Sequence, residues 1–332
     1  MTDLTAIVPQ RNFGDYQNLI YARGRIDGVV PPFTTDLARL PDLARSVLQE
    51  PEAGVLFDNA GDGRLTSANV AAFDAWRIVP RQLRGTAVRD HSVTVLGTPM
   101  PAPLLLGPVG VQTLAHPDGE LASAAAAAAL GLTYVHSTQA SHSIEDVARA
   151  NGPGQRWFQL YWPDDDDLTL SFLTRAARAG YSTLVLTLDT NVAVGYRPHD
   201  LDLGYLPFLR GTGVANYFSD PAFRASLAAT PEDDPLAAAL RYAAVYARTE
   251  LRWADLPFLR EHWQGPIVLK GILSVDDAKQ AVEAGMDGIV VSNHGGRQIA
   301  ASVTSLQVLP SIVDAVGDQI TVLFDSGIRT GG

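Results

Sequence analysis

One pattern recurs along the chain from about residue 100 onward. A short apolar run of β-prone residues ends in small or polar residues, and an alanine-rich amphipathic stretch follows it. Near-continuous apolar strands that alternate with helices are typical of a parallel sheet whose outer face is covered by helices. Repeated without a break, this pattern predicts an α/β fold of the (β/α)8 or TIM-barrel type.

The pattern supplies seven strands of such a barrel. The expected strands are Leu104–Gly110, Tyr134–Ala140, Trp157–Trp162, Thr183–Asp189, Ile267–Ile272, Gly288–Asn293 and Thr321–Gly327. The expected helices between them are Gly119–Leu130, Ser143–Asn151, Asp167–Ala179, Val275–Ala284 and Thr304–Ala315. The sequence stops at Gly332, so the eighth strand and the closing helices are absent. We therefore expect a fragment or a truncated reading frame.

Residues 1–95 precede the barrel and 96–332 carry strands one to seven. The leading part predicts helices, most clearly over Thr35–Leu48, then an extended segment at Val93–Leu96 and a turn at Gly97–Pro101. No linker separates the parts, so residues 1–332 are expected to form a single domain. The gap between strands four and five, residues 190–266, is far longer than the others and contains a helix-like stretch at Pro235–Thr249. Such a long connection is usually a lid or substrate loop.

Charge and composition exclude several classes of protein. The net charge of −11 argues against nucleic acid or an anionic membrane as a partner, so any anionic ligand must be held by local cations. Cysteine is absent, which excludes disulfides and thiolate chemistry. The N-terminus lacks the order of a signal peptide, and the run Leu121–Val135 is too short to span a bilayer, so we expect a soluble cytoplasmic protein. The acidic run Asp164–Asp167 opens a helix, which favours an N-terminal cap over a metal site.

In barrels of this type the catalytic groups lie at the C-terminal ends of the strands. Almost every expected strand ends there in a hydrogen-bonding group. These groups are Gly107–Gly110, Ser137 with Thr138, Gln159 with Tyr161, Thr187 with Asp189, Lys270, Ser292–His294, and Asp325–Gly327 with Arg329. A purely structural barrel has no reason to place them there.

The densest cluster is Ser292–Gln298, Ser-Asn-His-Gly-Gly-Arg-Gln. Its two glycines permit a sharp turn and the close approach of a flat ligand. His294 supplies an imidazole, the side chain most often used for proton transfer, and Arg297 offers a fork for a carboxylate. We interpret the cluster as catalytic; the alternative is a loop histidine with a surface arginine.

Lys270 is one of only two lysines in a chain that otherwise uses arginine, which suggests that a compact point charge is needed at this strand end. The alternative is a lysine whose amine reaches solvent. Asp189 is placed to orient a histidine or, alternatively, to cap the next segment. Tyr161 and Arg197 are each able to bind a small anion.

Six segments carry a resemblance to a known family. They are Ser-Asn-His-Gly-Gly-Arg-Gln (292–298), Val-Leu-Lys-Gly (268–271), Phe-Gln-Leu-Tyr (158–161), Leu-Thr-Leu-Asp-Thr (186–190), Ala-His-Pro-Asp-Gly-Glu (115–120) and Phe-Asp-Ser-Gly-Ile-Arg (324–329). From about residue 13 to its end, the chain resembles the FMN-dependent α-hydroxy-acid dehydrogenases and oxidases. Asn12–Gly24 and Gly195–Gly211 look most like the bacterial lactate 2-monooxygenase branch.

The resemblance implies roles for individual residues. His294 is the base, held by Asp189; Arg297 and Arg197 bind the substrate carboxylate, and Tyr161 contacts its hydroxyl. The residues implied in FMN binding are Pro108, Val109, Gly110, Ser137, Gln159, Thr187, Lys270, Ser292, Asp325, Ser326, Gly327 and Arg329. The resemblance also implies a 2-hydroxy-acid substrate, O2 as electron acceptor, and a homo-oligomer.

This set of residues also makes chemical sense by itself. Oxidising an α-hydroxy acid requires a base, cations for the carboxylate, and an acceptor for two electrons. Side chains cannot accept hydride, so a cofactor is obligatory. The chain has no Gly-x-Gly-x-x-Gly fingerprint after a strand, which weighs against a nicotinamide site.

The chain departs from the family pattern at three places. Asp58 stands where the family has a tyrosine that binds the substrate carboxylate, and an aspartate there would repel it; the following segment, Gly61–Thr66, looks shortened. Gln139 stands where an aromatic residue is frequent, which suggests an altered side-chain pocket. The missing eighth strand removes part of the phosphate site, so we expect the 332-residue chain to retain FMN poorly.

Three functions therefore compete. The first is oxidation of a small 2-hydroxy acid to the 2-oxo acid, with oxidative decarboxylation by O2 as an alternative outcome. The second is a tailoring flavin oxidase for a larger hydroxy acid, favoured by Asp58 and Gln139. The third is an inactive remnant, favoured by the missing strand.

Overall fold

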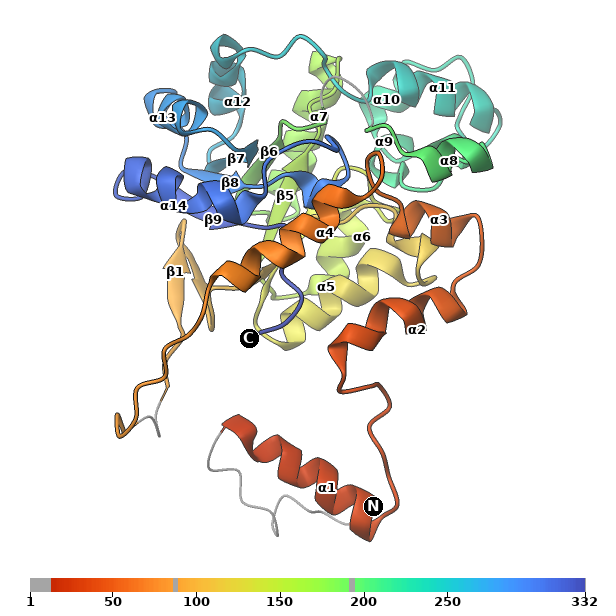
Figure 1. The fold of residues 1–332 in the computed structure, drawn as a ribbon. Coiled ribbons are helices and arrows are strands. Elements are labelled where there is room, and N and C mark those ends of the chain that lie inside the picture. The colour runs from red at the N-terminus through yellow and green to blue at the C-terminus, as the bar shows by residue number, and fades with distance from the viewer. Residues whose placement is uncertain (1–12, 86–88, 191–194, 332) are drawn as a thin grey trace. The chain divides into compact units, whose positions relative to one another are not determined.

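The computed structural model describes residues 13–85, 89–190 and 195–331 (Figure 1). The chain divides into two compact units, and each is considered by itself. The leading unit comprises Met1–Gln49, Arg77–His91 and Arg329–Gly332; the barrel unit comprises Glu50–Trp76 and Ser92–Ile328. The described helices of the leading unit are η2 (Phe13–Asp15), α1 (Tyr16–Ile26), η3 (Leu37–Arg39) and α2 (Leu40–Val47). That residues 1–332 form a single domain stays a prediction.

A parallel sheet of seven strands runs through the barrel unit in the order of the sequence, β3-β4-β5-β6-β7-β8-β9. The strands are β3 (Leu105–Leu106), β4 (Thr133–Ser137), β5 (Arg156–Leu160), β6 (Leu184–Thr187), β7 (Ile267–Ile272), β8 (Gly288–Val291) and β9 (Thr321–Phe324). All seven expected strands are confirmed, and the α/β barrel-type fold with them. Six of the expected strands ran too far at their C-terminal ends, because the chain leaves the ladder after Leu106, Ser137, Leu160, Thr187, Val291 and Phe324.

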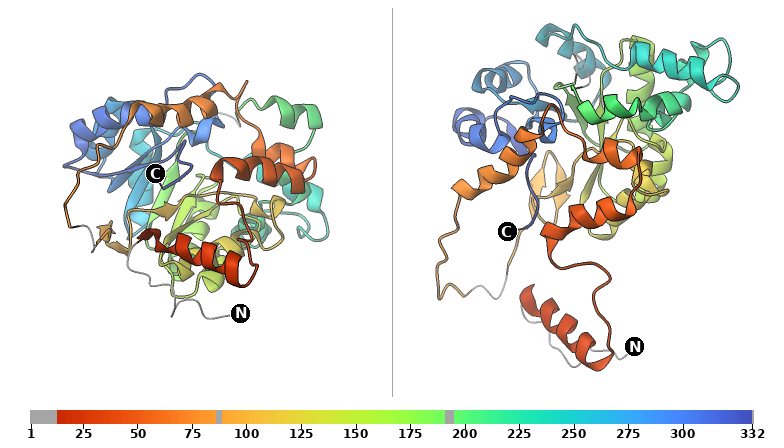
Figure 2. Two further views of the ribbon diagram at one scale, coloured as in Figure 1. Left: turned by 60° about the horizontal axis from the view of Figure 1, so that its bottom comes forward. Right: turned by 45° about the vertical axis from the view of Figure 1, so that its right-hand side comes forward.

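Helices connect successive strands and lie outside the curled sheet (Figure 2). Before β3 come α3 (Glu52–Phe57), α4 (Arg64–Ala71) and η4 (Ala72–Ala75). Between the strands come η5 (Gln112–Leu114), α5 (Gly119–Ala129), α6 (Ile144–Asn151), α7 (Asp166–Arg178), α13 (Val275–Glu283), η8 (His294–Gly296) and α14 (Ser305–Val316). The expected turn at Gly97–Pro101 is wrong: Leu96 and Gly97 make the turn of a hairpin, with positive φ at both, between β1 (Val93–Val95) and β2 (Thr98–Met100).

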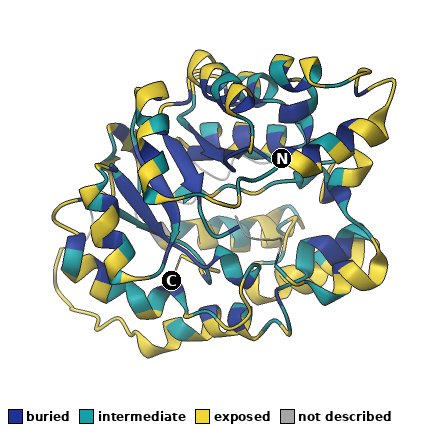
Figure 3. Cartoon of the chain, turned by 90° about the horizontal axis from the view of Figure 1, so that it is seen from above, coloured by how far each residue is buried: buried dark blue, intermediate teal, exposed yellow. Residues whose placement is uncertain are grey.

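Side chains on each strand alternate between the two faces of the sheet, and this alternation decides where the site lies. The outward residues join the large core under the helices, for example Leu184, Leu186 and Leu269. The inward residues form a second apolar layer of Val135, Trp157, Val185, Val268 and Val290, which packs against Met100 of the hairpin. Figure 3 shows the strands as the buried centre of the molecule. The next inward-facing side chain, two residues further along each strand, therefore lies beside this apolar layer on the side of the strands' C-terminal ends.

The long β6–β7 connection folds into a helical insertion. Its elements are α8 (Pro198–Leu203), η6 (Pro207–Arg210), α9 (Ala215–Phe218), α10 (Pro221–Ala225), α11 (Pro235–Val245), η7 (Trp253–Asp255) and α12 (Leu256–His262). Two arginines at the end of α11 tie it to the start of α7: Arg241 pairs with Asp165 at 2.7 Å, and Arg248 pairs with Asp166 at 2.5 Å. Asp165 also accepts the backbone N–H of Leu168 as the N-cap of α7. The acidic run thus caps a helix, as expected.

Two searches of the described residues bear on other functions. No helix there is both long and apolar enough to cross a membrane. No group of three or more acidic, histidine or cysteine side chains in the described ranges is placed to hold a metal ion.

Candidate active site

A polar layer lies on the inner face of the sheet, two residues beyond the apolar layer on each strand. It consists of Ser137, Gln159, Thr187, Lys270 and Ser292, all buried. The Ser137 hydroxyl donates to Gln159 Oε1 at 2.9 Å, and Lys270 Nζ donates to Ser292 Oγ at 2.9 Å. The strand alternation that builds the core therefore gathers five predicted FMN-binding residues in one place.

His294 and Asp189 meet above this layer. His294 Nδ1 lies 2.7 Å from Asp189 Oδ1, which leaves Nε2 as the other nitrogen of the ring. Gly271 makes room for the carboxylate: it has φ +111°, and a Cβ there would lie 3.1 Å from Asp189 Cβ. The two residues are 105 positions apart in the sequence, and the fold places them as the resemblance implied.

Lys270 adds a buried positive charge beside this pair. Its ammonium lies 3.9 Å from Asp189 Oδ2 and 3.5 Å from Asp325 Oδ2. Burial opposes the charged form of each partner, but the attraction outweighs it. The pKa of Lys270 is therefore raised by Asp325 and Asp189, and the pKa of Asp189 is lowered by Lys270 and His294. Both groups stay ionised across the neutral range.

The end of β9 supports the β8 loop. The Ser326 hydroxyl donates to Asp325 Oδ1 at 2.8 Å and accepts the backbone N–H of Gly295 at 3.0 Å. Gly327 packs on the backbone of Asn69 in α4, where a Cβ would lie 2.4 Å from the carbonyl oxygen. Asp325, Ser326 and Gly327 thus lie beside Lys270 and the histidine loop. Arg329, the predicted phosphate residue, belongs to the leading unit.

Arg297 is held by the C-terminal end of α3. Its guanidinium donates to the backbone oxygens of Asp58 at 2.5 Å, Val55 at 2.9 Å and Leu56 at 3.4 Å. Burial, together with the nearby Arg197, lowers the pKa of Arg297. The predicted carboxylate fork is thus engaged by the chain's own carbonyl oxygens.

Asp58 does not point its carboxylate at open space. Its two carboxylate oxygens accept backbone N–H groups, that of Asn59 at 2.8 Å and that of Asp200 at 3.2 Å. Asp58 therefore supports the start of α8 while its backbone oxygen holds Arg297. The position that the family pattern gives to a tyrosine serves here to join α3, α8 and the arginine.

Arg197 precedes α8 and is paired with Asp200, Nε to Oδ2 at 2.8 Å. The contact is close but poorly aligned as a hydrogen bond, so we treat it as an ion pair. Burial raises the pKa of Asp200 in spite of Arg197. Tyr161 is buried nearby, and burial, Tyr246 and Asp189 raise its pKa well above the ordinary value, against Arg297 and Arg197. Tyr161 therefore stays a neutral donor at the predicted substrate position.

Several residues at the site were missed by the sequence analysis. Asn69 of α4 exchanges two hydrogen bonds with Asn293, at 2.7 and 2.9 Å. Gly296 was expected to admit a flat ligand, but its φ is +83° and a Cβ there would lie 2.6 Å from Thr66 Oγ1. The residue that Gly296 approaches closely is therefore Thr66 of α4. The amphipathic pattern of α4 gave no signal for this contact.

Tyr246, at the end of α11, was also missed. Its ring centroid lies 5.4 Å from that of Tyr161. On the neighbouring turn, Tyr242 accepts a hydrogen bond from Gln139 Nε2 at 2.6 Å. The insertion therefore contributes aromatic rings and hydroxyls to the wall beside Tyr161, as a lid or substrate loop would.

The residues present fit FMN. Gln159 Nε2 is a buried donor with no partner among the described residues, which suits a ring carbonyl of a bound flavin. Lys270 supplies a cation where a reduced flavin gains negative charge. Pro108, Val109 and Gly110 form the turn after β3, and the N–H of the next residue, Val111, donates to the Gln139 oxygen at 2.9 Å. That turn therefore lies against the end of β4, beside the polar layer.

Comparison with known proteins identifies the family of the chain. The family model described as FMN-dependent dehydrogenase matches residues 44–332. The chain is 46% identical over 327 residues to an FMN-dependent α-hydroxy acid dehydrogenase, qulF, of Penicillium citrinum, covering 98% of this chain and 81% of that protein. It is 39% identical over 293 residues to an L-lactate oxidase of Lysinibacillus sphaericus, covering 87% of this chain and 75% of that protein.

A solved structure of mandelate oxidase superposes with a TM-score of 0.77 at 36% identity, covering 90% of this chain and 80% of that one. The specific likeness to lactate 2-monooxygenases stays a prediction. Matched in sequence, fold and cofactor, the chain belongs to the FMN-dependent dehydrogenase family and is an FMN-dependent α-hydroxy-acid oxidoreductase.

Proposed function

We propose that this protein oxidises a small 2-hydroxy acid to the 2-oxo acid. The observation that carries the proposal is the His294–Asp189 pair at 2.7 Å, flanked by Lys270 and by two arginines. Bound FMN supplies the acceptor for the two electrons that leave the substrate carbon with its hydrogen. Every other part of the reaction falls to side chains of this chain.

His294 takes the hydroxyl proton of the substrate. Asp189 fixes the ring through Nδ1, so Nε2 is the nitrogen that faces the substrate, and the carboxylate stabilises the imidazolium that forms. Arg297 and Arg197 bind the carboxylate of the substrate. Tyr161 donates a hydrogen bond to the hydroxyl group of the substrate. The ammonium of Lys270 would stabilise the negative charge that a flavin gains on reduction.

The fate of the electrons is a separate part of the proposal. We propose O2 as the acceptor, which the L-lactate oxidase and 2-hydroxyacid oxidase among the relatives support by name. If the 2-oxo acid leaves first, O2 takes up two electrons and two protons and is released as hydrogen peroxide. If the 2-oxo acid stays, the peroxide would oxidise it in the site to the shorter carboxylic acid, CO2 and water, as in lactate 2-monooxygenase. A cytoplasmic location and a homo-oligomeric state also remain proposals, which cell fractionation and light scattering would test.

A second candidate substrate is a larger hydroxy acid. The observation that favours it is the Gln139–Tyr242 hydrogen bond, which gives the wall beside Tyr161 a polar character. A long substrate with a polar substituent would find partners there. A catalytically inactive relative is the third candidate, and flavin reduction by any hydroxy acid would exclude it.

The test is flavin bleaching. The FMN-loaded protein is mixed without oxygen with a series of 2-hydroxy acids of increasing side-chain size, and absorbance is followed by stopped flow. Fast bleaching by glycolate or lactate supports the first candidate, and bleaching only by large acids supports the second. Analysis of the aerobic products then separates peroxide release from decarboxylation. If no 2-hydroxy acid bleaches the flavin, the proposal is wrong.

A further inference from the structure

The segment that follows β4 is held by an unusual set of contacts. Ser137 is the last residue of β4, and residues 138–140 after it form neither helix nor strand, yet each carbonyl oxygen from 137 to 140 has a donor. The side chain of Asn216 serves two of them, Nδ2 lying 3.1 Å from the oxygen of Ser137 and 3.0 Å from that of Thr138. Backbone N–H groups serve the others: Val111 donates to Gln139 at 2.9 Å, and Ala215 donates to Ala140 at 3.1 Å. Helix α9 of the insertion thus supplies three of the four contacts.

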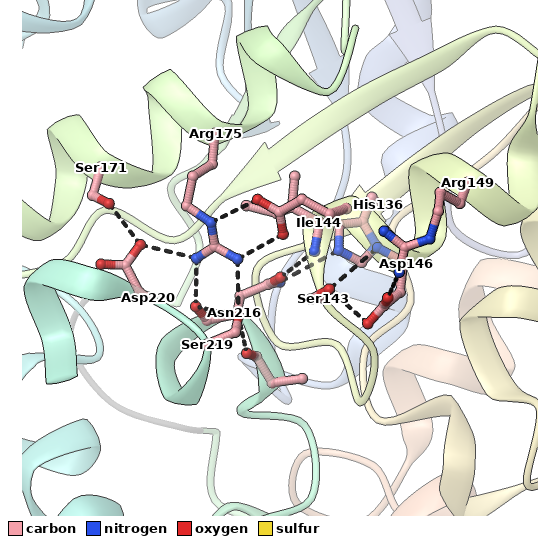
Figure 4. Close-up of polar contacts among 12 residues, drawn as sticks. His136, Ser143, Ile144, Asp146, Arg149, Ser171, Arg175, Asn216, Ser219 and Asp220 are labelled. Carbon is pink, nitrogen blue, oxygen red and sulfur yellow. Dashed lines mark hydrogen bonds and ion pairs between the residues drawn. The ribbon is translucent and has the colours of Figure 1, made fainter. Parts of the chain in front are cut away.

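Asn216 has no exposed surface, and its other polar atoms are also engaged. Oδ1 accepts the backbone N–H of Ile144 at the start of α6, at 2.8 Å. The backbone oxygen of Asn216 accepts Nη1 of Arg175 from α7, at 2.8 Å. Figure 4 shows this asparagine between the arginine and the end of β4. One side chain therefore joins α9, α6 and the strand end.

The imidazole of His136 completes these contacts. Its Nε2 lies 3.4 Å from Asn216 Nδ2. Burial lowers the pKa of His136 to about 4, so the ring is neutral at physiological pH. The two hydrogens of the Asn216 amide go to the carbonyl oxygens of Ser137 and Thr138, and a carboxylate in its place would have nothing to donate.

The held segment faces the FMN-binding layer. The Ser137 hydroxyl donates to Gln159 Oε1 at 2.9 Å and accepts the N–H of Gln139 at 3.1 Å. The first contact fixes the amide whose buried Nε2 has no partner in the part of the chain that the structure describes. The orientation of the Gln159 amide thus depends on the position of the Ser137 hydroxyl. That position in turn depends on the Ser137 backbone, which Asn216 holds.

We propose that Asn216 is a positioning residue for the flavin. It touches neither FMN nor substrate and acts through Ser137 on the Gln159 amide. The insertion, which covers the substrate side, is thereby joined to the cofactor side of the same pocket. The proposal rests on FMN binding, which the family shows, and is independent of the substrate proposed above.

The experiment is a double-mutant cycle on FMN affinity, measured by flavin fluorescence quenching during reconstitution of the apoprotein. Asn216→Asp keeps the shape and the acceptor for Ile144 but removes both donated hydrogen bonds. We expect about tenfold weaker FMN binding, the size of one lost buried hydrogen bond. Gln159→Leu should weaken binding by a similar factor. If Asn216 acts through Gln159, the double variant should bind FMN about as weakly as Gln159→Leu alone.

A merely structural role would lower the melting temperature and multiply the two losses in FMN affinity. That independence would overturn the proposal, as would unchanged affinity in Asn216→Asp. If Asn216→Asp does not fold, Asn216→Ser replaces it in the cycle and the same comparison decides. The control is Ser219→Ala, at the exposed residue that follows α9. It loses a contact to Arg175 but none to residues 137–140, and its FMN affinity should equal that of wild type.

Discussion

The two charged regions of the active site are held in different ways. In the acid–base region, His294, Asp189 and Lys270 hold one another at 2.7 and 3.9 Å, side chain to side chain. In the arginine region, Arg297 is held by backbone oxygens of α3, and Arg197 is held by Asp200. The first region is arranged for its task before any ligand arrives. In the arginine region, a substrate carboxylate would share the two guanidinium groups with their present partners or displace those partners.

The difference follows from how each region is built. Asp189 and the loop of His294 follow β6 and β8, and Lys270 lies on β7 between these strands, so the sheet fixes their spacing. The arginine region joins α3, α8 and the β8 loop, which no ladder connects. We therefore expect changes in the first region to affect the rate of flavin reduction, and changes in the second to affect ligand affinity.

The largest expected effect is that of His294→Gln. FMN should stay bound, but flavin reduction should slow by about 10²–10⁴-fold, the usual contribution of a general base. Anaerobic stopped-flow bleaching of the loaded protein measures this rate. A loss below tenfold would remove His294 from the role of base.

The next effect is that of Arg297→Met. A buried charge-assisted hydrogen bond contributes roughly 1.5–3 kcal/mol, so a carboxylate inhibitor should bind about 10- to 150-fold more weakly, while FMN affinity changes less. Titration of the flavin absorbance with the inhibitor gives the inhibitor affinity, and reconstitution of the apoprotein with FMN gives the FMN affinity. Arg149→Met, on the exposed side of α6, is the control and should change neither. Equal inhibitor affinity in Arg297→Met and wild type would contradict the assignment.

A smaller effect is expected from Asp58→Asn. The substitution keeps the backbone oxygen that holds Arg297 but removes a half-buried negative charge beside it. Partly exposed charge interactions are worth about 0.2–1 kcal/mol, so carboxylate inhibitors should bind roughly 1.4- to 5-fold more tightly. Asp202→Asn, an exposed position on the same helix as Asp200, should have no effect. Weaker binding in Asp58→Asn would mean that its structural role dominates.

The smallest effect concerns pH. Because the pKa of Asp189 is lowered in the folded protein, its contribution to stability is complete above the unfolded value of about 3.9 and is lost as pH falls through the folded value. In a His294→Gln background, which removes the titratable partner, the difference in unfolding free energy with and without Asp189→Asn should therefore stay constant from pH 8 to 5 and shrink only below about pH 4. Urea denaturation at several pH values tests this. A difference that already changes near pH 6 would contradict the ion-pair assignment.

Much of the fold and part of the site were predictable from the sequence. The alternation of apolar strands and helices predicted all seven strands, because burial on both faces leaves a signal in nearly every residue of a parallel strand. The position of Ser137, Gln159 and Lys270 at the C-terminal ends of expected strands marked them as candidate site residues. The strand-end motif at 292–298 pointed to His294 before any contact was known.

The tertiary structure alone decided which partners these residues have. Asn69, Thr66 and Asn216 are ordinary polar residues in their own helices, and their importance comes from contacts with residues 79 to 229 positions away. Asp58 looked like a repulsive substitution, yet its backbone oxygen holds Arg297 and its carboxylate supports α8. A sequence pattern reports the environment of a strand or helix face. It does not report the position of a helix end in the folded protein, because that position depends on how elements distant in the chain pack together.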